Sequence, residues 1–290
     1  MTRALGTLPT TPREPARRHT GHPIVRVAGL TLVGLLFVLP FYWMVVSSFR
    51  PLAEYYAYPI PLFPTHPTLD NYALLFERSL FLRGLLNSTC LAVVAVVTQV
   101  FFCALAGYAF AKLSFRGRDA LFVGILATMM LPSSVTLVPS FMLMAKLRWI
   151  DTYWPLIVPG IANAFGIFWM RQYCRSLSTE LLDAARIDGA SEFVIFWRIV
   201  VPIIQPALAS LAIFVFLSSW TDFQGPLIFL RSDTNYTVQL WLSYVSRNAE
   251  VFQPNLVMAG SVLASLPVVV IFVALQRYFV AGLTAGSIKS

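Results

Sequence analysis

The segment DAARIDGASEFVIFWRIVVP, residues 183–202, interrupts a chain that is otherwise strongly apolar. It carries five charged side chains and a glycine, and it lies between long uncharged stretches. Ser178 is placed to cap a helix that ends at Asp188, because its hydroxyl oxygen can accept from the exposed amides of the first turn. Gly189 can take positive φ at no steric cost, and Ser191 can cap a second helix. The segment therefore predicts two helices joined by a tight turn.

The sequence on either side of this segment is that of a membrane protein. Of 290 residues, 58% are hydrophobic and 12% are charged, whereas soluble domains are about 25% charged. Six uncharged windows are each long enough to cross a bilayer as a helix, which needs about 17 to 25 residues. A barrel would instead show segments of about ten residues with alternating polarity. We therefore expect an all-α, polytopic membrane protein with six transmembrane helices, at residues 27–49, 84–111, 120–145, 152–170, 199–221 and 251–276.

The basic residues predict an orientation for these helices. Fourteen of the 21 lie in segments that share a side with the amino terminus, so both termini are expected in the cytoplasm. The net charge of +8 is explained by this topology and by attraction to anionic lipid head groups rather than by nucleic-acid binding. Residues 1–23, rich in Pro, Thr and Arg, predict a disordered cytosolic tail. The membrane domain then covers residues 24–290.

Several kinds of activity are disfavoured. No Gly-Lys-Ser/Thr loop for nucleotide phosphates is present, and no helix carries histidines at metal-ligand spacing. The three cysteines, Cys90, Cys103 and Cys174, have no Cys-x-x-Cys spacing and are interpreted as packing residues. The six windows contain no Asp, Glu, His or Arg that could bind a coupling ion. Transport by this chain therefore takes its energy from another protein or needs none.

The opening segment resembles the EAA loop of the membrane subunits of bacterial ABC importers. That loop reads Glu-Ala-Ala, three residues, Gly, nine residues, Ile-x-Leu-Pro. The present chain has this spacing throughout, with Asp in place of Glu and Val in place of Leu, at Asp183-Ala184-Ala185, Gly189, Ile199, Val201 and Pro202. The resemblance implies a cytoplasmic helix-turn-helix coupling loop, residues 174–203, that docks on a partner ATPase.

The same resemblance implies which residues make the contact. In the coupling loop these are Asp183, Ala184, Ala185, Asp188, Gly189, Ala190, Phe196 and Pro202. In such families the carboxyl tail also reaches the ATPase, which adds Thr284 and Gly286. A helix-turn-helix in a cytoplasmic loop is equally typical of a surface element with no partner, so the pattern without the resemblance leaves docking open.

Further stretches are similar to the carbohydrate branch of these importers, and to the second permease of the maltose-type pair. They are WTDFQGPLIFL at 220–230, YTVQLWL at 236–242 and the ending QRYFVAGLTAGSIKS. The implied complex contains a second, different permease, two copies of an ATPase that binds ATP and Mg, and an extracytoplasmic solute-binding protein. The resemblance implies no cofactor on this chain. Glycerol-phosphate importers share most of these stretches, so that solute class stays open.

A solute path is expected near five polar or aromatic residues, because sugars are held by aromatic faces and hydrogen-bonding side chains. They are Asn87, Asn163, Trp220, Asp222 and Gln224. Trp220 is also explained, and better, by an interfacial aromatic belt. Asp222 is equally an interfacial acid, and Asn163 is equally an interhelical hydrogen-bonding residue.

Three classes of function follow from these patterns. The first is the permease subunit of an ATP-driven carbohydrate importer, which is not itself an enzyme. The second is a self-sufficient channel or facilitator, which needs no docking loop. The third is a membrane enzyme or assembly factor, which would place polar catalytic groups at one depth of the membrane. No such cluster is present in the six windows.

Overall fold

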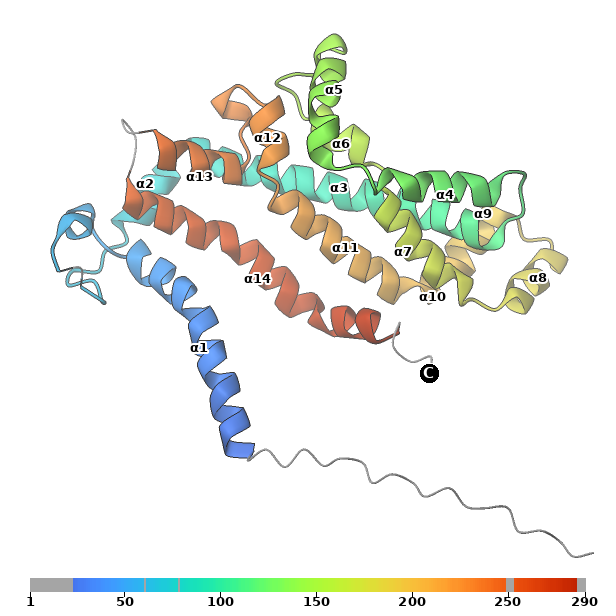
Figure 1. Ribbon diagram of the computed structural model, residues 1–290, viewed down its shortest axis with the longest axis horizontal. Helices are drawn as coiled ribbons and strands as arrows, with labels where there is room; N and C mark the ends of the chain where they lie inside the picture. The colour runs from blue at the N-terminus through green and yellow to red at the C-terminus, as the bar shows by residue number, and fades with distance from the viewer. Residues whose placement is uncertain (1–22, 60, 78, 249–252, 286–290) are drawn as a thin grey trace, which may run out of the picture. The chain divides into compact units, whose positions relative to one another are not determined.

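The computed structural model describes residues 23–59, 61–77, 79–248 and 253–285, and all regular structure in these ranges is helical (Figure 1). The chain divides into two units, residues 1–43 and 44–290. The long helices are α1 (Pro23–Ser48), α3 (Ser79–Lys112), α4 (Arg118–Thr128), α5 (Ser133–Lys146), α7 (Ala164–Arg175), α11 (Gln205–Trp220) and α14 (Pro254–Ala285). The shorter helices are η1 (Leu52–Tyr56), α2 (Asp70–Glu77), α6 (Trp154–Ile157), η2 (Val158–Gly160), α8 (Thr179–Ile187), α9 (Glu192–Ile195), the π-helix η3 (Phe196–Val200), α10 (Val201–Ile203), α12 (Gln224–Phe229), η4 (Asp233–Asn235) and α13 (Val238–Arg247).

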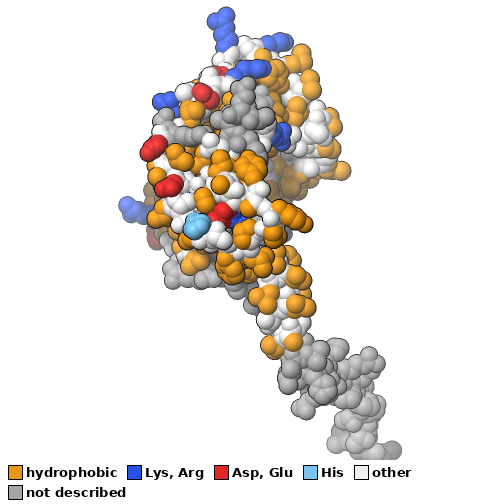
Figure 2. All heavy atoms as spheres, turned by 90° about the vertical axis from the view of Figure 1, so that its left-hand side faces the viewer, with side chains coloured by type: hydrophobic (Ala, Val, Ile, Leu, Met, Phe, Trp, Pro, Cys, Tyr) orange, Lys and Arg blue, Asp and Glu red, His pale blue; other side chains and the backbone are white. Residues whose placement is uncertain are grey.

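The first unit holds most of α1. From Val27 onward this helix carries no charged residue, and its apolar side chains are exposed from Val27 to Tyr42 (Figure 2). The stretch Val27–Ser48 is long and apolar enough to cross a membrane. In a bilayer such side chains face lipid, so their exposure is the expected state.

The six predicted spans appear in three different forms. Three are continuous helices that pass the length and hydropathy requirement, namely α1, α3 and α14. Two are bent pairs, with a 97° angle between α4 and α5 and an 81° angle between Glu192–Ile203 and α11. The described chain thus has three to five helices or bent pairs able to span, rather than six regular ones.

Prolines explain these interruptions. Pro132 precedes α5 at the first bend, and Pro202 and Pro206 flank Ile204 at the second. The remaining expected span, residues 152–170, is divided among α6, η2 and α7. Its two prolines remove backbone donors, and each lies in the first turn of a short helix. Irregular backbone of this kind is tolerated in membranes where protein or a cavity surrounds it.

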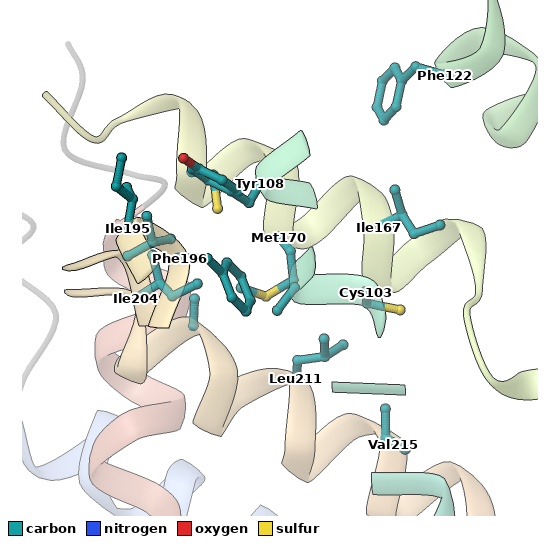
Figure 3. Packing of buried hydrophobic residues seen from close by; sticks show 14 of the residues in the cluster. Cys103, Tyr108, Phe122, Ile167, Met170, Ile195, Phe196, Ile204, Leu211 and Val215 are labelled. Atoms are coloured by element: carbon teal, nitrogen blue, oxygen red, sulfur yellow. The ribbon is translucent and has the colours of Figure 1, made fainter. Parts of the chain in front are cut away.

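In the second unit, α3 is the central helix. It packs against α7 and α11, and α11 packs in turn against α14 (Figure 1). Two buried clusters result. One contains Tyr108, Met170, Phe196, Leu211 and Val215, and Figure 3 shows their side chains converging between α3, α7 and α11. The other, around Phe81 and Trp241, lies toward the opposite end of α3.

The contact between α3 and α7 depends on small residues. A Cβ atom on Gly107 would lie 2.5 Å from Cβ of Met170 and 2.8 Å from the backbone nitrogen of Arg171. Small side chains at such positions let two helix backbones approach closely, which is a main source of helix association in membranes. Cys103 and Cys174 are buried free thiols in the same cluster, whereas Cys90 is exposed.

The loop between α12 and α13 is fixed by one carboxylate. Asp151 accepts hydrogen bonds from the backbone nitrogens of Arg231 and Ser232, both at 2.9 Å, and from the amide of Asn235 at 3.2 Å. It also accepts from the hydroxyl of Ser232. These bonds, the hydroxyl first, hold the pKa of Asp151 well below its ordinary value. The carboxylate thereby holds the loop that precedes α13.

We predict that Gly107→Ala destabilises the protein by about 1 to 3 kcal/mol, because the added methyl group forces α3 away from α7. The measurement is the thermal midpoint of the purified protein in detergent. Gly124→Ala on α4 is the matched control, since nothing lies within 4 Å of a Cβ at that position. Equal midpoints for the two variants would show that the close approach does not stabilise the fold.

Candidate functional site

The helix-turn-helix elbow, residues 178–203, forms as its local sequence predicts. The hydroxyl of Ser178 accepts from the backbone nitrogen of Leu181 at 3.3 Å and so caps α8. Gly189 has φ +83°, the left-handed conformation expected of it. Ser191 occupies the cap position of α9 but makes no side-chain capping bond. The Ser178 cap and the positive φ of Gly189 are therefore confirmed, whereas Ser191 has the predicted position without the predicted capping bond.

An arginine holds the two helices of the elbow together. Nε of Arg186 donates to Oε1 of Glu192 at 2.7 Å, and Nη1 donates to Oδ1 of Asp183 at 2.6 Å. The hydroxyl of Tyr108 on α3 donates to the second oxygen of Glu192 at 2.6 Å. The two carboxylates raise the pKa of Arg186 further above its ordinary value. We call these four residues the clamp; it connects α8, α9 and α3.

The inner side of the elbow is also fixed to the membrane domain, by a hydrogen bond from Lys112 and by buried side chains. Nζ of Lys112, at the end of α3, donates to the carbonyl oxygen of Leu177 at 2.6 Å, just before α8 begins. Leu182 is 1% exposed and belongs to the same buried cluster as Tyr108. Phe196 is also 1% exposed, with its ring 5.7 Å from that of Tyr108. Phe196 was expected to contact an ATPase, but in this structure it anchors the elbow from inside.

Two large apolar side chains are exposed at the tip of the elbow. Ile187 is 86% exposed and Phe193 is 61% exposed, on either side of the exposed Gly189. Of the other predicted contact residues, Asp183, Ala184, Asp188 and Pro202 are exposed, while Ala185 and Ala190 are half-buried. Thr284 lies near the end of α14, and Gly286 lies outside the described residues, as does the predicted tail apart from Pro23.

Two of the five predicted solute-path residues line cavities. Asn163 caps α7 through a 2.6 Å bond from the nitrogen of Gly166, and its amide donates to Oε1 of Gln99 on α3 at 2.7 Å. It therefore makes an interhelical hydrogen bond and also lines a cavity. Asp222 accepts from the nitrogen of Gly225 at 3.1 Å and lines a second cavity.

The other three predicted residues have different surroundings. Trp220 is 2% exposed, its indole nitrogen donates to the carbonyl of Ala264 at 3.0 Å, and it stacks on Phe216. Both expectations for Trp220, solute contact and interfacial belt, are therefore wrong, because it packs in the second core cluster. The amide of Asn87 donates to the carbonyls of Thr234 and Tyr236 and thus braces a loop. Gln224 is exposed at the start of α12.

Sequence reasoning missed the residues that join these parts. Tyr108, Gln99, Arg186 and Glu192 were not proposed as site residues. Gln99 carried a signal, since it is a polar amide near the middle of a 34-residue apolar helix. Arg186 and Glu192 lie six residues apart across the predicted turn, a spacing that no helical pairing rule covers. Within the described residues no group of His, Cys, Asp or Glu is placed to hold a metal ion.

We predict that Arg186→Gln loosens the elbow, because both carboxylates lose their shared partner. Backbone amides of residues 188–192 should exchange with deuterium about two- to fivefold faster, as expected for a partly exposed ion pair. The measurement is exchange mass spectrometry on the detergent-solubilised protein. Arg198→Gln removes the same charge from the same segment without touching the clamp, and exchange rates that rise equally in both variants would refute the assignment.

Comparison with known proteins places the chain in a family. Residues 99–285 match the family described as binding-protein-dependent transport system inner membrane component. The arabinooligosaccharides transport system permease protein AraQ of Halalkalibacterium halodurans is 37% identical, over 90% of this chain and 94% of AraQ. The lactose transport system permease protein LacG of Rhizobium radiobacter is 34% identical, over 92% of this chain and 96% of LacG.

A solved structure shares the fold. It is a bacterial ABC transporter involved in the import of the acidic polysaccharide alginate, with a TM-score of 0.81 and 25% identity over 92% of this chain and 100% of that chain. The all-α membrane permease fold predicted from the sequence is confirmed. The chain is a multi-pass membrane protein and belongs to the family of inner membrane components of binding-protein-dependent transport systems.

Proposed function

We propose that this chain is the sugar-translocating permease subunit of an ATP-driven importer, and that its elbow docks on a partner ATPase in the cytoplasm. The observation that carries the proposal is the exposure of Ile187 and Phe193 at the tip of the elbow. The clamp and the buried side chains beneath the tip hold it in place. Exposed apolar side chains next to a tight turn suit a cleft in another protein. Because the clamp connects the elbow to α3, displacement of the tip moves α3 as well.

The proposed complex has four kinds of component. Two copies of the ATPase bind ATP and Mg and carry out hydrolysis, and this chain has no catalytic role. A second, different permease completes the pathway, and an extracytoplasmic binding protein delivers the solute. The excess of basic residues in the segments on the amino-terminal side supports cytoplasmic termini and a cytoplasmic elbow. Thr284 and Gly286 are proposed as a second contact with the ATPase.

The mechanism follows from the mechanics of the elbow. ATP closes the ATPase dimer and draws the docked elbows of the two permeases together. The connected helices then rock between inward-open and outward-open states, as rigid bodies do in alternating access. A flexible loop would absorb this displacement, whereas the clamp and the Phe196 anchor transmit it.

The solute class is supported by the relatives. Those named above are described as permeases for arabinooligosaccharides and lactose. A glycerol-phosphate-type importer is the alternative raised by the sequence, and a self-sufficient facilitator is a weaker one. A facilitator has no use for an elbow with an exposed apolar tip.

We predict that Gly189→Asp abolishes solute-stimulated ATP hydrolysis and leaves membrane insertion intact, because a charged side chain enters the docking turn. The measurements are co-purification of the ATPase and hydrolysis by the complex in proteoliposomes. Gly117→Asp is the matched control. Gly117 also has positive φ and nothing within 4 Å of its added Cβ, but it lies between α3 and α4.

Normal hydrolysis by the Gly189 variant, or equal loss in both variants, would contradict docking through the elbow. Solute uptake into vesicles that contain this chain without any ATPase would favour the facilitator instead.

A further inference from the structure

Two cavities flank Gln99 on the central helix α3. One measures about 450 Å³ and the other about 320 Å³. Both are lined by Gln99, Val215 and Ser218, so the same strip of α3 and α11 forms part of each wall. Gln99 lies near the middle of α3, a helix of 34 residues. The two cavities therefore adjoin each other at Gln99, Val215 and Ser218.

The larger cavity has the chemistry of a saccharide subsite. Its walls include the amides of Gln99 and Asn163, the hydroxyl of Ser218, and the rings of Phe165 and Phe214. The two rings meet edge to face, with centroids 6.0 Å apart. The bond from Asn163 to Gln99 uses one amide hydrogen and leaves the amide nitrogen of Gln99 to donate to a ligand. Aromatic faces pack on sugar C–H surfaces, while amides and hydroxyls exchange hydrogen bonds with sugar hydroxyls.

The smaller cavity indicates which charge a ligand can carry. Its lining is mostly polar and includes Ser219, Thr237 and one acid, Asp222. Among the described residues, none of those lining either cavity is Lys, Arg or His. An anionic solute would lose its hydration here without gaining a counter-charge, and it would approach the carboxyl group of Asp222. A repulsive group of this kind is a common source of specificity.

We propose that this chain itself contributes a subsite for uncharged saccharides, in which Gln99, Asn163 and Ser218 bind sugar hydroxyls and Asp222 rejects uronates and phosphates. This inference rests on the proposed function and limits the solute to uncharged saccharides. It separates this importer from one that carries an acidic polysaccharide, as the structural relative does. It also disfavours the glycerol-phosphate alternative, since the cavity walls of this chain offer a phosphate no cation.

The test is binding of two trisaccharides to the detergent-solubilised complex of both permeases and the ATPase, without the binding protein. Maltotriose is the neutral probe and trigalacturonate the acidic one, and saturation-transfer NMR detects such weak ligands directly. Leaving out the binding protein ensures that its own selectivity does not enter the result. Co-purification of the ATPase shows that each variant is assembled.

We expect the native complex to bind maltotriose and not trigalacturonate. Gln99→Leu and Ser218→Ala should weaken maltotriose binding about three- to tenfold, the range for one or two lost hydrogen bonds. Asp222→Asn should allow trigalacturonate to bind, and the asparagine oxygen can still accept from Gly225. Thr98→Val is the control and should change nothing, because the hydroxyl of Thr98 donates to the carbonyl of Val94 and lines neither cavity.

Three results would overturn the subsite: no maltotriose binding, equal binding of both probes by the native complex, or equal maltotriose binding by the native complex and by the Gln99 and Ser218 variants. Each would leave the docking proposal standing if the ATPase co-purifies. Failure of the ATPase to co-purify with the native chain would instead contradict the proposed function.

Discussion

The close packing of α3 against α7 is the contact on which the rest of the membrane domain depends. It is possible only because Gly107 has no side chain to collide with Met170. With the two helices in place, the end of α3 supplies Lys112 and Tyr108 to the elbow, and its middle supplies Gln99 to the cavities. One helix thus connects both candidate sites, and its close approach to α7 depends on Gly107.

The buried core extends this connection from side chain to side chain. Phe196, on the inner side of the elbow, belongs to the same cluster as Leu211 and Val215 (Figure 3). Leu211 and Val215 also line the larger cavity. Protein interiors are densely packed and move as bodies rather than deforming smoothly. In the proposed mechanism, a displacement of the elbow therefore moves the cavity wall, because no flexible segment lies between them.

Local features could be predicted from the sequence, and long-range ones could not. The Ser178 cap and the positive φ of Gly189 depend on neighbouring residues only, and both formed as expected. Trp220 was misjudged because its partner, Ala264, is 44 residues away. The bond from Tyr108 to Glu192 spans 84 residues, and no periodicity encodes it. Prolines lie at the bends of the spans, but their positions in the sequence do not say how far each divides a span.

The claim that elbow and cavity move as one body is tested most directly by a distance within this chain. Spin labels at Glu180 on α8 and Val97 on α3, both exposed, report it by pulsed electron paramagnetic resonance. When the assembled complex is trapped with ATP and vanadate, the separation should stay within about 2 Å of its nucleotide-free value. A shift of about 5 Å, one helical turn, would show that the elbow slides over the bundle and would contradict the account.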